Sequence, residues 1–361
     1  MADSNRLVEQ VQVRIDEFLS TRVPIVAAIS PDLTPLVAFS RQFLSGGKRF
    51  RALFCYSGWQ GAGSSAQDLS PIISAAAALE IFHAAALVHD DIIDNSDTRR
   101  GSASAHKLFE GMHGENAWAG SRSEFGRAAG ILLGDLLLGW SDELLDEGLD
   151  AAPDQTAARL ARAEFNRMRT EVTAGQYLDI LEERAWLTQP EAELLDRALR
   201  VIVYKSAKYS VQAPLVIGAA LAGASPAQLD TLRAFGLPLG IAYQLRDDLL
   251  GVFGDAAVTG KPSGDDLREG KRTVLVALAR QGLSDATRHD LDEQLGDPTL
   301  DEARIAALQR LILASGAVDR VEGLIEANVA EAVLALEDSP IGEDAREQLR
   351  SLVERVTRRA F

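Results

Sequence analysis

The sequence predicts an all-α protein, and three observations support this prediction. Apolar residues recur at helical spacing through most of the chain, for example in residues 7–19, 36–43 and 48–58. Alanine and leucine dominate these stretches, and both are good helix formers. No clean run of alternating apolar and polar residues is bounded by hairpin turns, so strands are not expected. We expect ten or more helices.

The most apolar helix is expected at residues 72–94, and it should be buried on most sides. Ser70 and Pro71 precede it, a pair typical of a helix start because serine caps the first turn and proline fits within that turn. The same pair, Ser225 and Pro226, indicates the start of a later helix.

Two polar stretches, residues 95–126 and 254–271, interrupt the helical pattern. Each directly follows a pair of aspartates. Long loops without periodicity in a compact domain tend to be functional, so both are expected to border a site.

The length and charge of the chain narrow its class. With 361 residues, 47% of them hydrophobic, the chain can bury a large core. No Pro- or Ser-rich linker divides it, so residues 1–361 are expected to form a single domain. The 37 Lys and Arg residues face 53 Asp and Glu, a net charge of −16. This balance argues against nucleic acid as the main partner, because phosphate binding requires basic patches.

A cytoplasmic location is expected. The single cysteine, Cys55, allows no intrachain disulfide and is expected to be a small buried apolar residue. The N-terminus is polar and has no apolar signal core. The most apolar runs, residues 72–88 and 128–140, are interrupted by charged or polar side chains, so stable membrane insertion is not expected.

The most apolar helix ends in three carboxylates, Asp90, Asp91 and Asp94, which Arg99 and Arg100 follow. Residues four apart share a helix face, so Asp90 and Asp94 can point the same way. Mg²⁺ prefers oxygen ligands and often bridges carboxylates to substrate phosphates, and arginine forks match phosphate oxygens. Taken alone, the pattern is compatible with a metal–diphosphate site and with a solvated acidic face.

A second acidic pair, Asp247 and Asp248, also lies in an apolar segment that predicts a helix. Two such helices facing each other would place four or five carboxylates around a cavity, suited to several Mg²⁺ ions and a diphosphate. Together the two clusters favour a site over two solvated faces.

Basic residues supply the other half of such a site. Lys48, Arg49 and Arg51 follow a pair of glycines, an arrangement suited to a second anion bound without metal, or to a plain basic loop before a helix. Lone lysines such as Lys205 and Lys261 are typical of a protein surface. Only the presence of the two acidic clusters makes them candidates for the site.

In this order, the motifs resemble those of the trans-prenyltransferases, the polyprenyl diphosphate synthases that make farnesyl, geranylgeranyl and longer chains. The matching segments are residues 46–51, 80–101, 175–176, 205, 244–248 and 260–271. The resemblance implies a single large helical bundle of the isoprenoid synthase type with a central cavity. It also implies a homodimer.

The resemblance implies a role for each matching residue. Mg²⁺, as three ions per site, would be bound by Asp90, Asp91, Asp94, Asp247 and Asp248. The allylic diphosphate would be contacted by Arg99, Lys205, Ser206, Gln244 and Lys261. Isopentenyl diphosphate would bind without metal to Lys48, Arg51, His83 and Arg100, with Arg49 nearby. His83 has an alternative interpretation as an internally satisfied core histidine.

The implied reaction condenses isopentenyl diphosphate with dimethylallyl, geranyl or farnesyl diphosphate, head to tail and trans. The metal ions would stabilise the diphosphate as it leaves, so that an allylic cation forms. The alkene of isopentenyl diphosphate would then attack this cation, and a proton would be lost to the departing diphosphate.

The second acidic motif departs from the family pattern. The family commonly has DDxxD there, but Gly251 occupies the last position. Asp255 lies about 12 Å further along a helix than Asp247, at 1.5 Å per residue, so it cannot replace the missing acid. We expect Asp247 to be the main metal ligand of this helix, with water in place of the lost carboxylate.

Product length is predicted from the turn before Asp90, where the resemblance places the growing chain. Ala86 and Ala85 are small there, whereas short-chain members of the family often carry an aromatic residue. Phe82, about one 5.4 Å turn deeper, is the first bulky residue. This predicts a C20 product, geranylgeranyl diphosphate, with longer chains as the alternative. These alanines can also be interpreted as mere helix-packing residues.

Two other functions would leave different marks. A class I terpene synthase shares the helical fold, but it would carry an Asn/Asp–Ser/Thr–Glu triad in place of Asp247 and Asp248, and it would not need Lys48 and Arg51. A non-catalytic partner subunit of another synthase can lose its aspartate motifs, and Gly251 is the one feature that favours this alternative.

Overall fold

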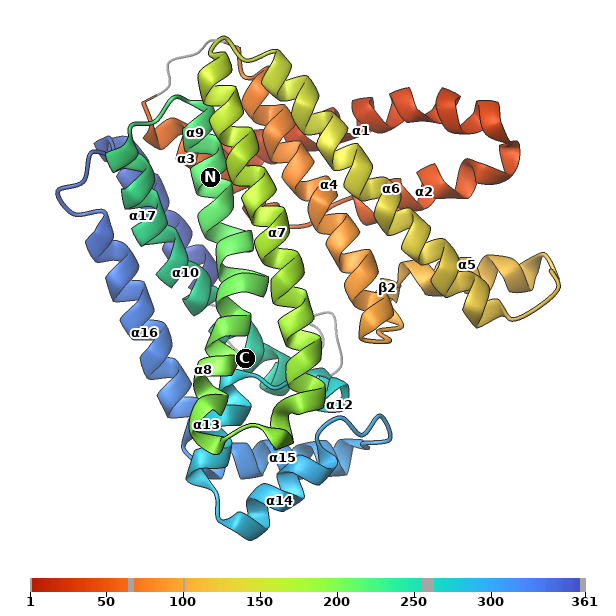
Figure 1. Cartoon of the computed structure of the whole chain (residues 1–361), viewed down its shortest axis with the longest axis vertical. Coiled ribbons are helices and arrows are strands. Elements are labelled where there is room, and N and C mark those ends of the chain that lie inside the picture. The colour runs from red at the N-terminus through yellow and green to blue at the C-terminus, as the bar shows by residue number, and fades with distance from the viewer. Residues whose placement is uncertain (1, 64–67, 100, 255–262, 358–361) are drawn as a thin grey trace. The chain divides into compact units, whose positions relative to one another are not determined.

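The computed structural model describes residues 2–63, 68–99, 101–254 and 263–357. Nearly all of its elements are helices, so the predicted all-α class is confirmed (Figure 1). The chain divides into two compact units, residues 1–162 with 217–224, and residues 163–216 with 225–361. The expectation of one domain over the whole chain stays a prediction.

The first unit is built around one apolar helix, α4. Its elements are α1 (Ala2–Ile29), η1 (Pro31–Leu33), α2 (Thr34–Phe43), α3 (Phe50–Gly61), α4 (Ser70–Ile93), β1 (Thr98–Arg99), β2 (Ser102–Ala103), α5 (Ala105–Glu115) and α6 (Arg122–Asp150). Two further helices, α7 (Gln155–Ala185) and α9 (Ala213–Leu221), cross the boundary between the units.

α4 begins at Ser70 and ends at Ile93, close to the bounds that the sequence predicts. It is long and apolar enough to cross a membrane by length and composition, but 83% of its most apolar window is buried inside the protein. Burial on most sides is the property expected of a central core helix. α4 is therefore the core of this unit.

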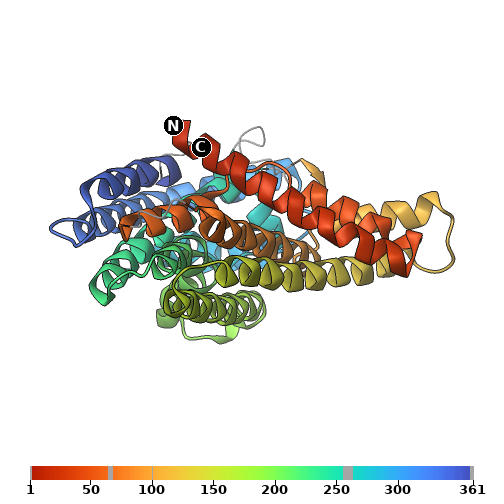
Figure 2. The same ribbon diagram turned by 90° about the horizontal axis from the view of Figure 1, so that it is seen from above.

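α4 and α6 lie side by side (Figures 1 and 2), and small residues on α6 permit their close approach. A Cβ added to Gly148 would stand 2.7 Å from the Cβ of Ser74. The Ser141 hydroxyl donates a 2.7 Å hydrogen bond to the Ala78 carbonyl. Because Ser141 and Gly148 are seven residues apart, the contact repeats on the same face of α6. This close packing of α4 against α6 fixes the position of the acidic end of α4 along α6.

The polar stretch at 95–126 is more ordered than the sequence predicts. A two-residue antiparallel ladder pairs Thr98 with Ala103 and Arg99 with Ser102. The helix α5 follows, and it buries a stripe that includes two histidines. Polar members on the buried face hide the helical period of α5 from a sequence reading.

The second unit contains the remaining elements. They are η2 (Trp186–Thr188), η3 (Glu191–Glu193), α8 (Leu194–Val201), η4 (Ile202–Gln212), α10 (Pro226–Phe253), α12 (Asp265–Glu269), α13 (Val274–Gly282), α14 (Asp285–Gln294), α15 (Glu302–Ala314), α16 (Ala317–Ala335) and α17 (Glu343–Thr357). Ser225 caps α10 in a capping box with Gln228, so the predicted helix start is confirmed.

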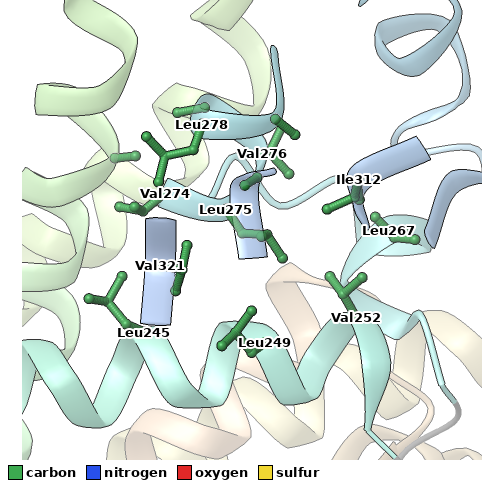
Figure 3. Packing of buried hydrophobic residues seen from close by; sticks show 14 of the residues in the cluster. Leu245, Leu249, Val252, Leu267, Val274, Leu275, Val276, Leu278, Ile312 and Val321 are labelled. Carbon is green, nitrogen blue, oxygen red and sulfur yellow. The ribbon is translucent and has the colours of Figure 1, made fainter. Parts of the chain in front are cut away.

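The core of this unit forms where α10 meets α13 and α16. Figure 3 shows Leu245 and Leu249 on one side of α10, pointing toward Val274 and Leu275 of α13 and Val321 of α16. All five side chains are 0% exposed. This packing fixes which side of α10 is left for polar residues.

Arg246 holds α10 to two later helices. Its guanidinium forms two 2.6 Å hydrogen bonds with the carboxylate of Glu322 on α16. Its Nε donates a 3.1 Å hydrogen bond to the carbonyl of Thr357 at the end of α17. A bidentate arginine–carboxylate pair is geometrically specific, so Arg246 sets the orientation of α10 although it lies between Gln244 and the acidic pair.

Cys55 on α3 is fully buried, as the sequence predicts, and burial raises the pKa of its thiol. Such a thiol is inert at neutral pH because the thiolate is the reactive form.

Candidate active site

The acidic end of α4 is bound by an arginine from the short ladder. Asp91 is 1% exposed, and the Arg99 Nε donates a 2.9 Å hydrogen bond to its Oδ1. The same guanidinium lies 3.7 Å from the Asp90 carboxylate. Asp90 and Asp94 are half-buried. A cation therefore already lies against two of the three predicted carboxylates.

A pocket of about 240 Å³ lies beside this ion pair. Its walls come from the end of α2, one face of α4 and the ladder, and its described lining residues are Gln42, Phe43, Ser45, Ala84, Leu87, Val88, Asp91, Arg99 and Ser102. The pocket thus has an apolar wall and a charged end, a combination typical of a site for an amphiphilic ligand.

The predicted chain-length residues lie elsewhere on α4. Ala85 is 0% exposed and Phe82 is 4% exposed. Neither belongs to the lining of the 240 Å³ pocket, and nor does Ala86, whereas Ala84 and Leu87 do. The role of Ala85, Ala86 and Phe82 in product length stays a prediction.

The loop before α3 turns sharply, and its basic residues separate into two kinds. Gly46 and Gly47 have φ values of +67° and +89°, a conformation that glycine adopts without a Cβ penalty. Arg49 is 7% exposed, whereas Lys48 is exposed and Arg51 is half-buried. Only the latter two side chains are accessible to a substrate.

Arg49 is an internal anchor. Its guanidinium lies 3.3 Å from the Glu80 carboxylate on α4 and donates a 2.6 Å hydrogen bond to Gln12 on α1. Glu80 also accepts a 3.1 Å hydrogen bond from the amide of Ala52. This network positions the loop against α4, which gives Arg49 a structural role; the expectation that it also lies near a substrate stays a prediction.

In the second unit, Lys205 lies in an 11-residue π-helix, η4. A π-helical stretch is rare and frequently marks a functional site. A Cβ on Gly175 of α7 would stand 2.8 Å from the Lys205 Cα, so α7 and η4 are in backbone contact. Ser206 follows Lys205 and is half-buried.

Two lysines meet at one buried carboxylate. Lys205 forms an ion pair with Asp179 of α7, which is 8% exposed. The Lys271 ammonium lies 3.5 Å from the same Asp179 oxygen and 3.4 Å from Glu183. Asp179 therefore gathers positive charge from two segments distant in sequence.

The two aspartates of α10 have different surroundings. Asp247 is exposed, whereas Asp248 is 5% exposed and accepts a 2.8 Å hydrogen bond from Gln244. Burial raises the pKa of Asp248 well above its usual value, and the carboxylates of Asp266, Asp247 and Asp179 raise it further against the hydrogen bond from Gln244. A cation placed here would relieve that electrostatic cost.

The described ranges contain no group of three acidic, histidine or cysteine side chains arranged to hold a metal ion by themselves. The donor chemistry nevertheless fits Mg²⁺. Asp90 and Asp94 offer accessible carboxylates one turn apart, and Asp248 is a buried acid among other acids. Hard oxygen donors of this kind, completed by substrate phosphates and water, are the usual environment of Mg²⁺. Arg100 and Lys261 lie outside the described residues.

Comparison with known proteins identifies the family. A model of the polyprenyl synthetase family matches residues 35–312. The chain belongs to the polyprenyl synthetase family. It is 30% identical over 316 residues to a geranylfarnesyl diphosphate synthase of Aeropyrum pernix, covering 87% of this chain and 91% of that one. It is 33% identical over 273 residues to a geranylgeranyl diphosphate synthase of Sulfolobus acidocaldarius, covering 75% and 72%.

A solved structure agrees with this assignment. The geranylgeranyl pyrophosphate synthase of Corynebacterium glutamicum, crystallised with isoprenyl diphosphate and magnesium, is 40% identical to this chain and superposes with a TM-score of 0.92. The match covers 98% of this chain and 99% of that one. The resemblance to trans-prenyltransferases that the motifs predict is thus confirmed.

Within this polyprenyl synthetase, the structure brings together some predicted residues and adds others. Arg99 with Asp90 and Asp91, and Gln244 with Asp248, are direct neighbours. Three further residues, Asp179, Asp266 and Lys271, lie beside the predicted ones but have no role assigned from the sequence. The signal for Asp179 is its place one helical turn after Gln176, and that for the other two is their place in the motif that ends at residue 271.

Proposed function

We propose that this polyprenyl synthetase condenses isopentenyl diphosphate with an allylic diphosphate, and that its product is geranylgeranyl diphosphate. The observation that carries the proposal is the acidic end of α4, with Arg99 across it and an apolar-walled pocket beside it. A charged head and an apolar tail are the two parts of an isoprenyl diphosphate. The relatives' names, which include geranylgeranyl and geranylfarnesyl diphosphate synthases, support the same substrate class.

Magnesium fits the donor set described above. The residues that would hold it, as three ions, are Asp90, Asp91, Asp94, Asp247 and Asp248. When bound, Mg²⁺ supplies Lewis-acid stabilisation of the negative charge that develops on a leaving diphosphate.

The basic residues divide between the two substrates. We assign the allylic diphosphate to Arg99, Lys205, Ser206, Gln244 and Lys261, and isopentenyl diphosphate to Lys48, Arg51, His83 and Arg100. Arg99 and Lys205 are each held in place by a carboxylate, Asp91 and Asp179 respectively. Fixed cations stabilise developing charge without a reorganisation cost at the moment of reaction.

The reaction then follows from binding and orientation. The C–O bond of the allylic diphosphate breaks to give an allylic cation and free diphosphate. The alkene of isopentenyl diphosphate attacks the cation, which forms the new C–C bond, and the released diphosphate takes the proton that is lost. The apolar wall of α4 keeps water from the cation, which water would quench.

Assembly and location belong to the same proposal. We propose a homodimer, supported by Ile131 and Leu132 on α6, which are 45% and 65% exposed. Exposed apolar side chains that adjoin one another form the kind of surface that interfaces between subunits cover. Light scattering of the protein as it elutes from a size-exclusion column measures its oligomeric state directly. We also propose a cytoplasmic location, supported by the single reduced and buried cysteine.

The test is an assay with purified protein, Mg²⁺, isopentenyl diphosphate and each allylic primer in turn, with diphosphate release and product chromatography as readouts. We expect turnover with farnesyl diphosphate and a C20 product. Turnover of an allylic diphosphate without isopentenyl diphosphate would instead indicate a terpene synthase. No turnover with any primer contradicts the synthase function and leaves the partner-subunit alternative.

A further inference from the structure

His89, the residue before the first acidic motif, is bound to the neighbouring helix α6. Its Nε2 lies 3.2 Å from the carbonyl oxygen of Ile131 and 3.4 Å from the carboxylate of Asp135. Both partners can only accept, so Nε2 is assigned the ring hydrogen and donates the hydrogen bond to Ile131. A Cβ built on Gly134 would overlap the His89 ring. The glycine therefore leaves open the space on α6 that the ring occupies.

Two further contacts hold the same end of α4 to α6. The Ile92 side chain fills the space above Gly130, where a Cβ would stand 2.8 Å from the Ile92 Cδ1. Just past the end of α4, Asn95 accepts a 2.8 Å hydrogen bond from the guanidinium of Arg127. With the His89 contact, these fall on three successive turns of α6. The whole acidic motif lies between the first and the last of them.

The direction of the carboxylates follows from that of the His89 side chain. Successive residues of an α-helix are about 100° apart around its axis, so Asp91 points almost opposite to a His89 side chain that faces α6. Asp91 is 1% exposed there and accepts the hydrogen bond from Arg99. Asp90 and Asp94 are half-buried and share another face. A rotation of this last turn would therefore move all three carboxylates together.

The last turn of a helix needs a contact that defines its rotation. Its backbone hydrogen bonds are not continued by a further turn, and helix ends fray. Ile93 is 39% exposed, so apolar packing holds this turn on one side only. A hydrogen bond is directional and weakens steeply when it is misaligned. The bond from His89 to the Ile131 carbonyl thus defines the rotation more sharply than packing does.

We propose that His89 is a positioning residue, whose hydrogen bond to the Ile131 carbonyl fixes the direction in which Asp90 and Asp94 present their carboxylates. The inference rests on the proposed function, in which these carboxylates hold Mg²⁺. His89 itself touches neither metal nor substrate in this assignment. It acts through the geometry of its neighbours, where a misplacement of about 1 Å costs about 10²-fold in rate.

The first test compares substitutions of His89 that differ in the reach of their donor. The amide nitrogen of glutamine is as many bonds from Cα as the histidine Nε2, so His89→Gln keeps a donor within reach of Ile131. His89→Asn carries the same amide one bond short. The matched control is His113→Asn on α5, in the same unit, because it shortens a histidine–carbonyl contact of the same 3.2 Å length, to Ala119.

Mg²⁺ binding to the full-length proteins is measured by calorimetry with inorganic diphosphate present, so the readout does not depend on turnover. We expect His89→Asn to lower Mg²⁺ affinity by roughly 10–100-fold, the range seen when residues that orient metal ligands are changed, and His89→Gln and His113→Asn to change it less than about threefold. In turnover, kcat and the KM for the allylic diphosphate should change in His89→Asn, and the KM for isopentenyl diphosphate should not. A purely structural role would lower stability without this split.

A second readout needs neither metal nor substrate. The amides of Asp94 and Ser96 donate hydrogen bonds of 2.8 and 2.9 Å to the carbonyls of the acidic pair at residues 90–91. Their hydrogen exchange therefore reports the order of the last turn of α4. In EDTA, we expect both amides to exchange faster in His89→Asn than in the wild type, and at the wild-type rate in His113→Asn.

Gly134→Ala tests the same contact from α6. Its added methyl group would displace the His89 ring, so it should weaken Mg²⁺ binding in the wild-type background. It should add little in a His89→Ala background, because both changes break one contact and their effects are then not additive. The control is Gly111→Ala on α5, where a Cβ meets nothing within 4 Å, and it should leave the affinity unchanged.

The outcomes separate the two levels of the argument. Wild-type Mg²⁺ affinity in His89→Asn, or equal losses in His89→Asn and His89→Gln, overturns the positioning role of the hydrogen bond while an active wild type upholds the synthase. Circular dichroism and melting curves show whether each variant folds, and the asparagine and glutamine variants decide the question if His89→Ala does not. A wild type that neither binds Mg²⁺ with diphosphate nor turns over substrates overturns both proposals.

Discussion

Gly175 of α7 lies directly against the main chain of Lys205 in η4, such that a Cβ at position 175 would stand 2.8 Å from the Lys205 Cα and overlap its amide nitrogen. The two helices therefore touch backbone to backbone at this point. One helical turn further along α7, Asp179 forms an ion pair with the Lys205 side chain. Gly175 allows the two main chains to touch, and the ion pair with Asp179 fixes the orientation of the Lys205 side chain.

Gly175→Ala is expected to push η4 away from α7. Extra atoms in a well-packed contact cost about 1–3 kcal/mol, and the displacement should misplace Lys205, with a fall of about tenfold or more in kcat for the allylic substrate. The control is Gly323→Ala on α16, where a Cβ meets nothing within 4 Å. That substitution should be neutral or stabilising by about 0.4–1 kcal/mol. Melting curves and initial rates measure both; equal behaviour of the two variants would contradict the backbone contact.

Arg49 and Arg51 should respond oppositely to substitution. Arg49→Gln leaves Glu80 buried without its cation, a change that costs roughly 3–5 kcal/mol. The surviving folded protein should keep its KM for isopentenyl diphosphate. Arg51→Gln, at a more accessible position, should cost less stability than Arg49→Gln and raise that KM by about tenfold if the proposed substrate contact is lost. The stability of both variants is measured by denaturant unfolding, and their KM by titration of isopentenyl diphosphate. An increased KM in Arg49→Gln and an unchanged KM in Arg51→Gln would show that Arg49, and not Arg51, contacts the substrate.

Asp248→Asn should stabilise the metal-free protein at neutral pH. The folded-state pKa of Asp248 is raised by burial and by neighbouring carboxylates. A group with a raised folded pKa favours folding fully below its unfolded pKa, about 3.9, and that contribution is lost as the pH rises through the folded value. Asparagine has no charge to bury, and its oxygen can still accept the hydrogen bond from Gln244.

The measurement is the melting temperature in EDTA from pH 4.5 to 8. We expect the wild type to lose stability relative to Asp248→Asn as the pH rises, and the variant to be the more stable protein at pH 8 but a poor enzyme. Saturating Mg²⁺ with diphosphate should narrow the gap by stabilising the wild-type carboxylate. Parallel pH profiles in EDTA would show that Asp248 ionises in the folded protein without a penalty.

The sequence predicts the positions of the main helices well, because helix starts and apolar periodicity are local features of the sequence. The pair Ser70–Pro71 and the apolar run behind it locate α4 almost to the residue, but the predicted cap is wrong: Ser70 is the first residue of the helix, and Leu69, which makes no side-chain cap hydrogen bond, precedes it. The cap at Ser225 locates the start of α10. The first acidic motif could be found by its spacing, because Asp90 and Asp94 are four residues apart and share a helix face. The second could be found as a pair of adjacent aspartates in an apolar segment.

The features that the sequence does not predict depend on tertiary contacts. A π-helix at Lys205 has nearly the same apolar spacing as an α-helix, so the apolar pattern of the sequence does not distinguish the two. Arg49 and Arg51 are two residues apart, and burial alone separates the anchor from the accessible cation. The approach of the Asp266 carboxylate to Gly251 could not be predicted from spacing, because α12 reaches α10 through the fold and not through the helical repeat.

Product length offers a test that distinguishes two faces of α4. If the growing chain lies along the face of α4 that carries Ala86, as predicted, Ala86→Phe should shorten the product from C20 to C15. The rate of the first condensation should then change little. If it occupies the 240 Å³ pocket, whose wall includes Ala84 and Leu87, Ala84→Phe should shorten it instead. Ala85 is fully buried, so Ala85→Phe should also cost about 1–3 kcal/mol of stability by overpacking. Chromatography of the products from farnesyl diphosphate identifies the face, and a C20 product from all three variants would place the length-limiting wall on another helix.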